Sequence, residues 1–183
     1  MTFLNGVVRA IDATNEYIGR AVSWLALAMV LIQVIVVVMR YVFGLSILVM
    51  QESIWYMHSI VFLVAAGYTL LHDAHVRVDI FYGAASRRGK AMIDLFGVLF
   101  ILLPVCIMLW VVAWPYVAAA WKVREGSVEV SGIQGVYLLK TCMLVFSATL
   151  FIQGISLAIK SAILLAGDDD AGNGSDDTME HGL

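Results

Sequence analysis

Long apolar stretches without charged residues alternate with short polar segments along this chain of 183 residues. Four stretches are long enough to cross the hydrocarbon core of a bilayer, which takes about 20 residues of helix. They cover residues 21–39, 54–71, 95–121 and 141–159. Each is expected to be a helix, because lipid offers no hydrogen-bond partner to an open strand. The pattern therefore predicts an all-α membrane protein with four transmembrane helices.

The third stretch is the longest of the four and contains two prolines, Pro104 and Pro115. A proline inside a helix removes one backbone hydrogen bond and bends the helix axis. We expect a bend near Pro104, and we expect Pro115 to lie near the end of the span.

The segment that precedes the first span has apolar and polar residues on opposite faces of a helix. Leu4, Val8 and Ile11 share one face of residues 3–18, and Asp12 lies on the other. Such a helix can lie in the membrane interface or pack on a partner. The alternative is a frayed start to the first span. The pattern favours an amphipathic interfacial helix at 3–18, followed by a four-helix domain at 19–166.

Two further segments lie outside the spans. Residues 167–183 are rich in glycine and hold six of the fourteen acidic residues, so they cannot bury enough apolar surface to fold and are predicted to be disordered. Polar and apolar residues alternate over 75–80, which fits a short strand or, equally, a helix end that dips into the interface.

Lysine and arginine residues are distributed unevenly between the two sides of the predicted bundle. The N-terminal segment, the second connection and the C-terminal segment share one side and carry seven of them, whereas the first and third connections carry four. Short cytoplasmic segments of membrane proteins carry the excess of basic residues. Both termini are therefore predicted to be cytoplasmic.

Composition excludes several classes of function. Apolar residues make up 62% of the chain and charged residues 14%, against about 25% charged in soluble proteins. There is no basic run for nucleic acid. The four stretches contain no Asp, Glu, Lys or Arg, the groups that commonly mark transport pathways inside membranes. No enzyme, metal or cofactor motif is found, so this chain is expected neither to catalyse a reaction nor to transport a solute alone.

A few polar residues nevertheless lie within the predicted spans. His58 has no second histidine on a facing helix that would complete a haem site, so a hydrogen bond to a neighbouring helix is favoured. Thr149, Gln153 and Ser156 share one face of the fourth span and are expected to cross-link helices, with a substrate contact as the alternative. The two cysteines lie in apolar stretches and are interpreted as small buried residues.

Several short motifs follow one another in a characteristic order. They are Arg40-Tyr41-Val42-Phe43-Gly44, Glu52, Ala65-Ala66-Gly67, His75-Val76-Arg77-Val78-Asp79, Glu129, Ser131, Lys140 and Gln153. Together with the four spans, this order resembles the small permease subunit (DctQ-like) of tripartite ATP-independent periplasmic (TRAP) transporters, over roughly residues 5–165. Gln51 departs from the pattern, because many members have a second acidic residue there.

The resemblance implies a role as a small scaffold subunit in the bacterial inner membrane. A large multi-span subunit would carry out sodium-coupled uptake of an organic acid that a periplasmic binding protein delivers. Arg40 and Glu52 lie at the two ends of the first connection, and we expect them to pair. His75, Arg77 and Asp79 are expected to fix the second connection or to hold the large subunit.

Two other classes of function stay open at this point, besides a plain assembly factor for some other complex, which only the identity of the partner would distinguish. One is a small carrier or channel that works alone, which predicts activity from this chain by itself. The other is a membrane anchor of an electron-transfer complex, which predicts a bound haem or quinone.

Overall fold

The computed structural model describes residues 2–75, 82 and 85–173, and all its regular elements are helical. They are α1 (Thr2–Val42), α2 (Leu48–Ser59), the π-helical stretch η1 (Ile60–Val64), α3 (Ala66–Leu71), α5 (Arg87–Gly97), the π-helical stretch η2 (Val98–Leu102), α6 (Leu103–Val123) and α7 (Val136–Asn173). Four helical segments are long and apolar enough to cross a membrane: Phe3–Val42, Leu48–Leu71, Arg87–Val123 and Val136–Ala166. The predicted all-α membrane protein with four spans is confirmed.

The amphipathic segment 3–18 and the first predicted span form one continuous helix, α1. At about 1.5 Å per residue, a helix of 41 residues is about 60 Å long, which is twice the thickness of a bilayer core. Its buried positions are Val8, Asn15, Gly19 and Val22, at the spacing of a heptad stripe that packs on other helices. The location of residues 3–18 in the membrane interface stays a prediction.

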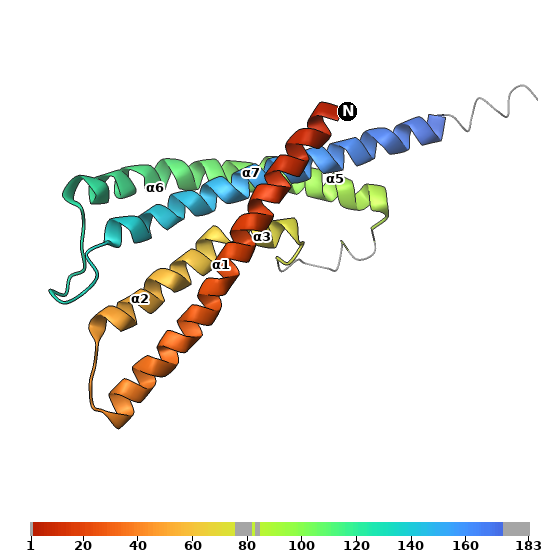
Figure 1. Ribbon diagram of the computed structural model, residues 1–183. Coiled ribbons are helices and arrows are strands. Elements are labelled where there is room, and N and C mark those ends of the chain that lie inside the picture. The colour runs from red at the N-terminus through yellow and green to blue at the C-terminus, as the bar shows by residue number, and fades with distance from the viewer. Residues whose placement is uncertain (1, 76–81, 83–84, 174–183) are drawn as a thin grey trace, which may run out of the picture.

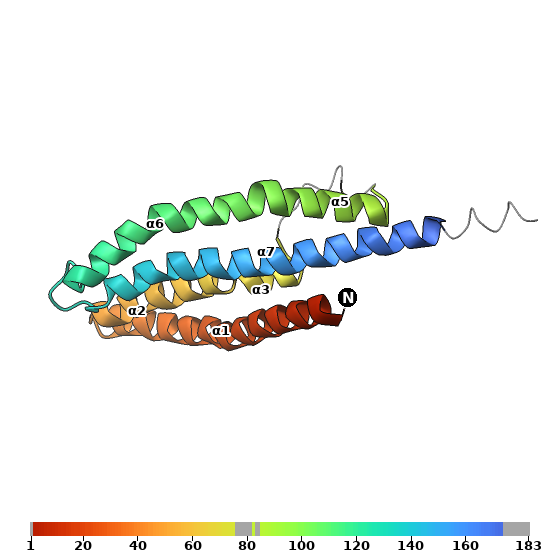
Figure 2. The same ribbon diagram turned by 90° about the horizontal axis from the view of Figure 1, so that it is seen from above.

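Helix α7 is the centre of the bundle. It lies between the layer of α5 and α6 and the layer of α2 and α3, and α1 crosses it (Figures 1 and 2). The N-terminus, the start of α5 and the end of α7 lie at one end of the bundle, and the first and third connections lie at the other (Figure 1). This arrangement agrees with four alternating spans.

The second and third spans both change from α- to π-helical geometry near their middle, at η1 and η2. Stretch η2 ends two residues before Pro104, where the sequence predicts a bend. A proline ring clashes with the carbonyl four residues earlier, and a wider π turn relieves this clash. Pro115 lies inside α6, which continues to Val123.

Two small residues, Ala66 and Cys106, lie together with Leu150 at the contact between the helices at the centre of the bundle. Ala66, Cys106 and Leu150 are buried together, and both cysteines are free thiols. Small side chains let helix backbones approach closely, which is the main source of packing energy within lipid. Large apolar side chains cover the outside of α1 and α6 instead, as expected for surfaces that face lipid or a partner.

Helix α7 extends into the segment 167–183 that composition predicts to be disordered. Its backbone is helical as far as Asn173, because each added residue continues an existing ladder of hydrogen bonds. Residues 174–183 lie outside the described part of the chain.

Candidate functional site

One group of polar residues joins the N-terminal half of α1 to the middle of α7, and we call it the Asp12 cluster. Its members are Asp12 and Asn15 of α1 and Gln153, Ser156 and Lys160 of α7. Asn15 Nδ2 donates to Gln153 Oε1 at 2.7 Å, and Gln153 Nε2 donates to Asp12 Oδ1 at 3.0 Å. Ser156 Oγ also donates to Asp12 Oδ1, at 2.8 Å, and Lys160 Nζ lies 2.7 Å from Asp12 Oδ2.

The Asp12 cluster is buried at its centre. Asn15 is 3% exposed, Gln153 2% and Ser156 0%. Each side chain has a partner within the cluster, so none of them carries the cost of an unpaired buried group. Hydrogen bonds between membrane helices contribute about 0.6 kcal/mol on average, so these four contacts together stabilise the bundle by about 2–4 kcal/mol. The cluster therefore fixes α1 against α7.

A second set of contacts continues from α1 to the end of α3. Glu16 Oε2 lies 2.7 Å from Nε2 of His72, and its Oε1 lies 2.6 Å from Nε of Arg20. The Tyr68 ring packs beside His72 and covers Gly19, where a Cβ atom would overlap it. These contacts are more exposed than the Asp12 cluster and contribute less.

Gly67 of α3 tests how closely α3 approaches α1 and α7 beside the Asp12 cluster. A Cβ atom there would lie 2.6 Å from Asn15 Oδ1 and 3.0 Å from the carbonyl oxygen of Thr149. We expect Gly67→Ala to lower the melting temperature of the detergent-solubilised chain. Gly97→Ala is the matched control, because a Cβ atom at Gly97 meets nothing within 4 Å and alanine favours a helix. Equal stability of the two variants would contradict the close approach.

At the other end of the bundle, Glu52 of α2 holds the third connection, residues 124–135. Although it is charged, Glu52 is only 6% exposed. Its Oε1 accepts a hydrogen bond from Ser127 Oγ and its Oε2 accepts one from the backbone N–H of Ile133, both at 2.5 Å. Arg40, the partner that sequence reasoning expected, is exposed and forms no ion pair with Glu52 in this structure. The carboxylate therefore holds the third connection and does not hold the first.

Lys140 fixes the start of α7 to the same connection. Its Nζ lies 2.5 Å from Glu125 Oε2 and 3.9 Å from the centre of the Tyr116 ring. Beside it, Trp121 Nε1 donates to Thr141 Oγ1 at 2.9 Å, which ties the end of α6 to α7. An ion pair, a cation–π contact and an indole hydrogen bond together close this end of the bundle.

The remaining predicted residues lie in the second connection. His75 is exposed, in a bend after α3. Arg77 and Asp79 lie outside the described residues, as does most of the alternation over 75–80. The structure thus brings Gln153, Glu52 and Lys140 into polar clusters, and it leaves Arg40 and His75 at the surface.

Several members of these clusters were not predicted from the sequence. Asp12 was predicted only to lie on the polar face of residues 3–18, and no role was predicted for Asn15 or Ser127. For Asn15 a signal existed, because it follows Val8 and precedes Val22 by seven residues each and so interrupts an apolar stripe. A single polar residue in such a stripe commonly sets the register of helix packing.

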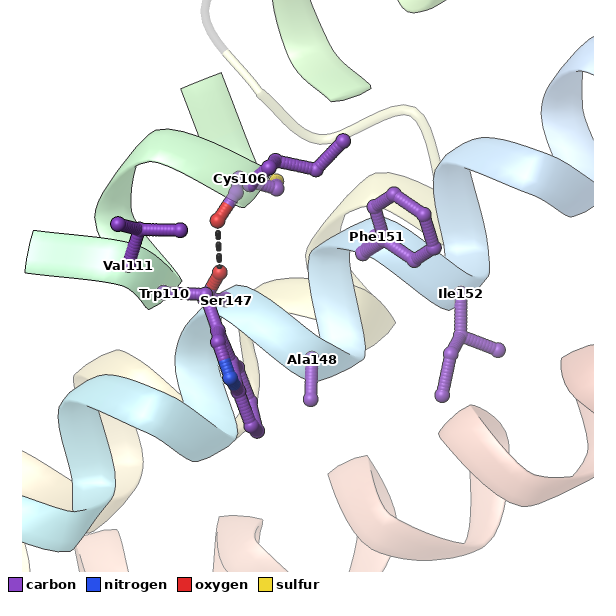
Figure 3. Close-up of a pocket in the computed structure, with 8 residues that line it drawn as sticks. Cys106, Trp110, Val111, Ser147, Ala148, Phe151 and Ile152 are labelled. Carbon is purple, nitrogen blue, oxygen red and sulfur yellow. Dashed lines mark hydrogen bonds between the residues drawn. The ribbon is translucent and has the colours of Figure 1, made fainter. Parts of the chain in front are cut away.

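Between α6 and α7 lies an apolar hollow of about 280 Å³, whose lining includes Cys106, Trp110, Phe151 and Ile152 (Figure 3). Ser147 Oγ donates to the carbonyl oxygen of Cys106 at 2.5 Å, so the polar atoms there are paired with each other. The hollow offers apolar contacts only. In the part of the chain that the structure describes, no three His, Cys, Asp or Glu residues gather into a metal site.

The sequence matches the family model described as "Tripartite ATP-independent periplasmic transporters, DctQ component" over residues 29–164, which is well over half of the chain. The chain belongs to the DctQ family. No curated protein and no solved structure matches it. DctQ proteins are membrane components of three-part transporters rather than enzymes, and they work there together with the DctM and DctP components. The match includes α7 with Gln153 and Ser156 but begins after Asp12 and Asn15.

Proposed function

We propose that this DctQ protein is the scaffold subunit of a TRAP transporter in the bacterial inner membrane. In this proposal the large subunit moves an organic acid together with sodium, and a periplasmic binding protein delivers the acid. Both termini lie in the cytoplasm. The observation that carries the proposal is that Asn15, Gln153 and Ser156, the most buried polar side chains between α1 and α7, are paired within the chain.

A substrate or sodium site needs polar atoms that are free to bind. In the Asp12 cluster, the Asp12 carboxylate accepts from Gln153 and Ser156 and pairs with Lys160. The Glu52 carboxylate of α2 is likewise occupied by two donors from the third connection. Such pairing makes a rigid body, which is the property that a scaffold for a moving partner requires.

The outer faces of α1 and α6 supply the surface for such a partner. Val34 is 55% exposed on α1, and Val111 is 65% exposed on α6. These faces are broad and apolar, and within a membrane either lipid or the helices of the large subunit can cover them. His75, Arg77 and Asp79 of the second connection are proposed to hold that subunit in register, as is Arg40 near the end of α1.

Co-purification tests this proposal. A tag after Leu183 is expected to recover one large multi-span membrane protein in stoichiometric amount from gently solubilised native membranes. Cells that lack this chain are expected to lose uptake of the substrate of that partner. Recovery of the chain alone, with transport by it in liposomes, would support a small carrier instead. Recovery with a haem absorption spectrum would support an electron-transfer anchor.

A variant in the second connection tests the proposed contact residues. Arg77→Gln combined with Asp79→Asn is expected to reduce recovery of the large subunit several-fold while leaving this chain folded. Lys122→Gln, a charge change at the opposite end of the bundle, is the control and is expected to recover the partner normally.

A further inference from the structure

At the end of the bundle that holds the N-terminus, basic residues surround a hollow between α5 and α7. The hollow has a volume of about 260 Å³. Arg87 and Lys90 from the first turn of α5 line one side, and Lys160 and Ser161 of α7 line the other. Lys160 also pairs with Asp12 in the Asp12 cluster, but the other residues of the hollow belong to neither polar cluster described above, and the scaffold role does not require the hollow.

We propose that this hollow binds the head group of an anionic phospholipid, with phosphatidylglycerol as the defining ligand. The site combines three cationic side chains with the hydroxyl group of Ser161, which suits the charge and the acceptor oxygens of a phosphodiester. Basic hollows between transmembrane helices on the cytoplasmic side are typical sites for such head groups. The proposal rests on the predicted orientation and is independent of the transported substrate.

Asp94 lines the hollow and Asp12 lies beside it, and both carboxylates already have partners. Asp94 Oδ2 accepts a hydrogen bond from the Tyr82 hydroxyl at 2.9 Å, and Asp12 Oδ2 pairs with Lys160 at 2.7 Å. Lys160 keeps 42% of its side chain exposed, and Arg87 is exposed. Lys90 lies 5.3 Å from the centre of the Tyr82 ring. Three cations against two carboxylates leave the hollow with a net positive charge.

The apolar wall of the hollow favours binding of a lipid over binding of a soluble anion. Leu157 and Leu164 of α7 and Ala91 of α5 form the apolar part of the lining, so the polar rim continues into an apolar wall between two spans. A head group at the rim can therefore place its glycerol and acyl chains along the helices. The first turn of α5 adds the positive end of a helix dipole on the same side as Arg87 and Lys90.

Native mass spectrometry of the delipidated full-length chain in mild detergent tests this proposal. With phosphatidylglycerol and phosphatidylcholine added in equal amounts, we expect the wild type to retain phosphatidylglycerol in at least about fivefold excess. Arg87→Gln with Lys90→Gln should abolish that preference, whereas Lys90→Arg should keep it. The matched control is Lys122→Gln with Arg124→Gln, which removes two charges at the opposite end and should keep it as well. Elution in size-exclusion chromatography shows whether each variant is folded.

Three results would overturn the proposal. The first is an equal preference for phosphatidylglycerol in the Arg87–Lys90 double variant and in the wild type. The second is loss of the lipid adduct on addition of millimolar inorganic phosphate, which would indicate a site for the free anion. The third is lipid binding only after Asp168, Asp169 and Asp170 are changed to Asn, which would mean that the acidic end of the chain occupies the hollow.

Discussion

Replacement of Gln153 with leucine is expected to destabilise the bundle by about 2–4 kcal/mol, because Asn15 loses its acceptor inside a buried contact and Asp12 loses one of its donors. For a chain of this length, such a loss lowers the melting temperature by about 5–10 °C. The measurement is the temperature at which the detergent-solubilised, fluorescently tagged chain disappears from its size-exclusion peak.

Two further variants make this result specific to the Asp12 cluster. Gln33→Leu removes an exposed amide from α1 and is expected to leave the melting temperature almost unchanged. Asn15→Leu in the Gln153→Leu background removes both partners, and part of the stability should return because no unpaired amide remains between them. If Gln153→Leu melted at the same temperature as Gln33→Leu, the cluster would not hold α1 against α7.

Replacement of Glu52 with alanine is expected to release the third connection while leaving the four spans folded. Ser127 and the backbone N–H of Ile133 both lose a charged acceptor that is shielded from water. A hydrogen bond to a charged group contributes about 1.5–3 kcal/mol, so the amide of Ile133 should exchange with solvent deuterium about 10- to 100-fold faster. Hydrogen–deuterium exchange over residues 124–135 measures this change.

A milder substitution at Glu52 and a control variant make the exchange experiment more specific. Glu52→Gln should have a smaller effect, because the amide oxygen still accepts from Ile133 and the amide NH₂ group can donate to Ser127 Oγ. Glu129→Ala removes an exposed acid from the same connection and is the control. Exchange at Ile133 that is equally fast in Glu129→Ala and Glu52→Ala would mean that the carboxylate of Glu52 does not hold the connection.

The two variants report on different levels of the structure. Gln153 joins helices that are far apart in sequence, so its loss should affect the whole bundle. Glu52 joins a helix to a connection, so its loss should stay local. A scaffold subunit needs a rigid set of membrane helices, to which Gln153 contributes. It also needs an ordered surface that faces the water, to which Glu52 contributes.

The four spans could be predicted from the sequence, because bilayer thickness sets the length of apolar helix that a membrane requires. The sequence predicted a bend near Pro104, where the structure has the π-helical stretch η2, since proline acts on its own turn of helix. It also pointed to Gln153, because a buried amide in lipid needs a partner. These are properties of single segments, and the neighbours of a segment do not alter them.

Which polar groups contact one another became visible only in the folded chain. The partners of Gln153 and Glu52 are distant in sequence, and both depend on the position of α7 between the other helices. Arg40 was predicted to pair with Glu52 because the two residues are near in sequence. In the folded chain Glu52 instead accepts hydrogen bonds from Ser127 and Ile133. Spacing along a chain predicts contacts within one helix, but contacts between helices follow from packing, which depends on all of the helices together.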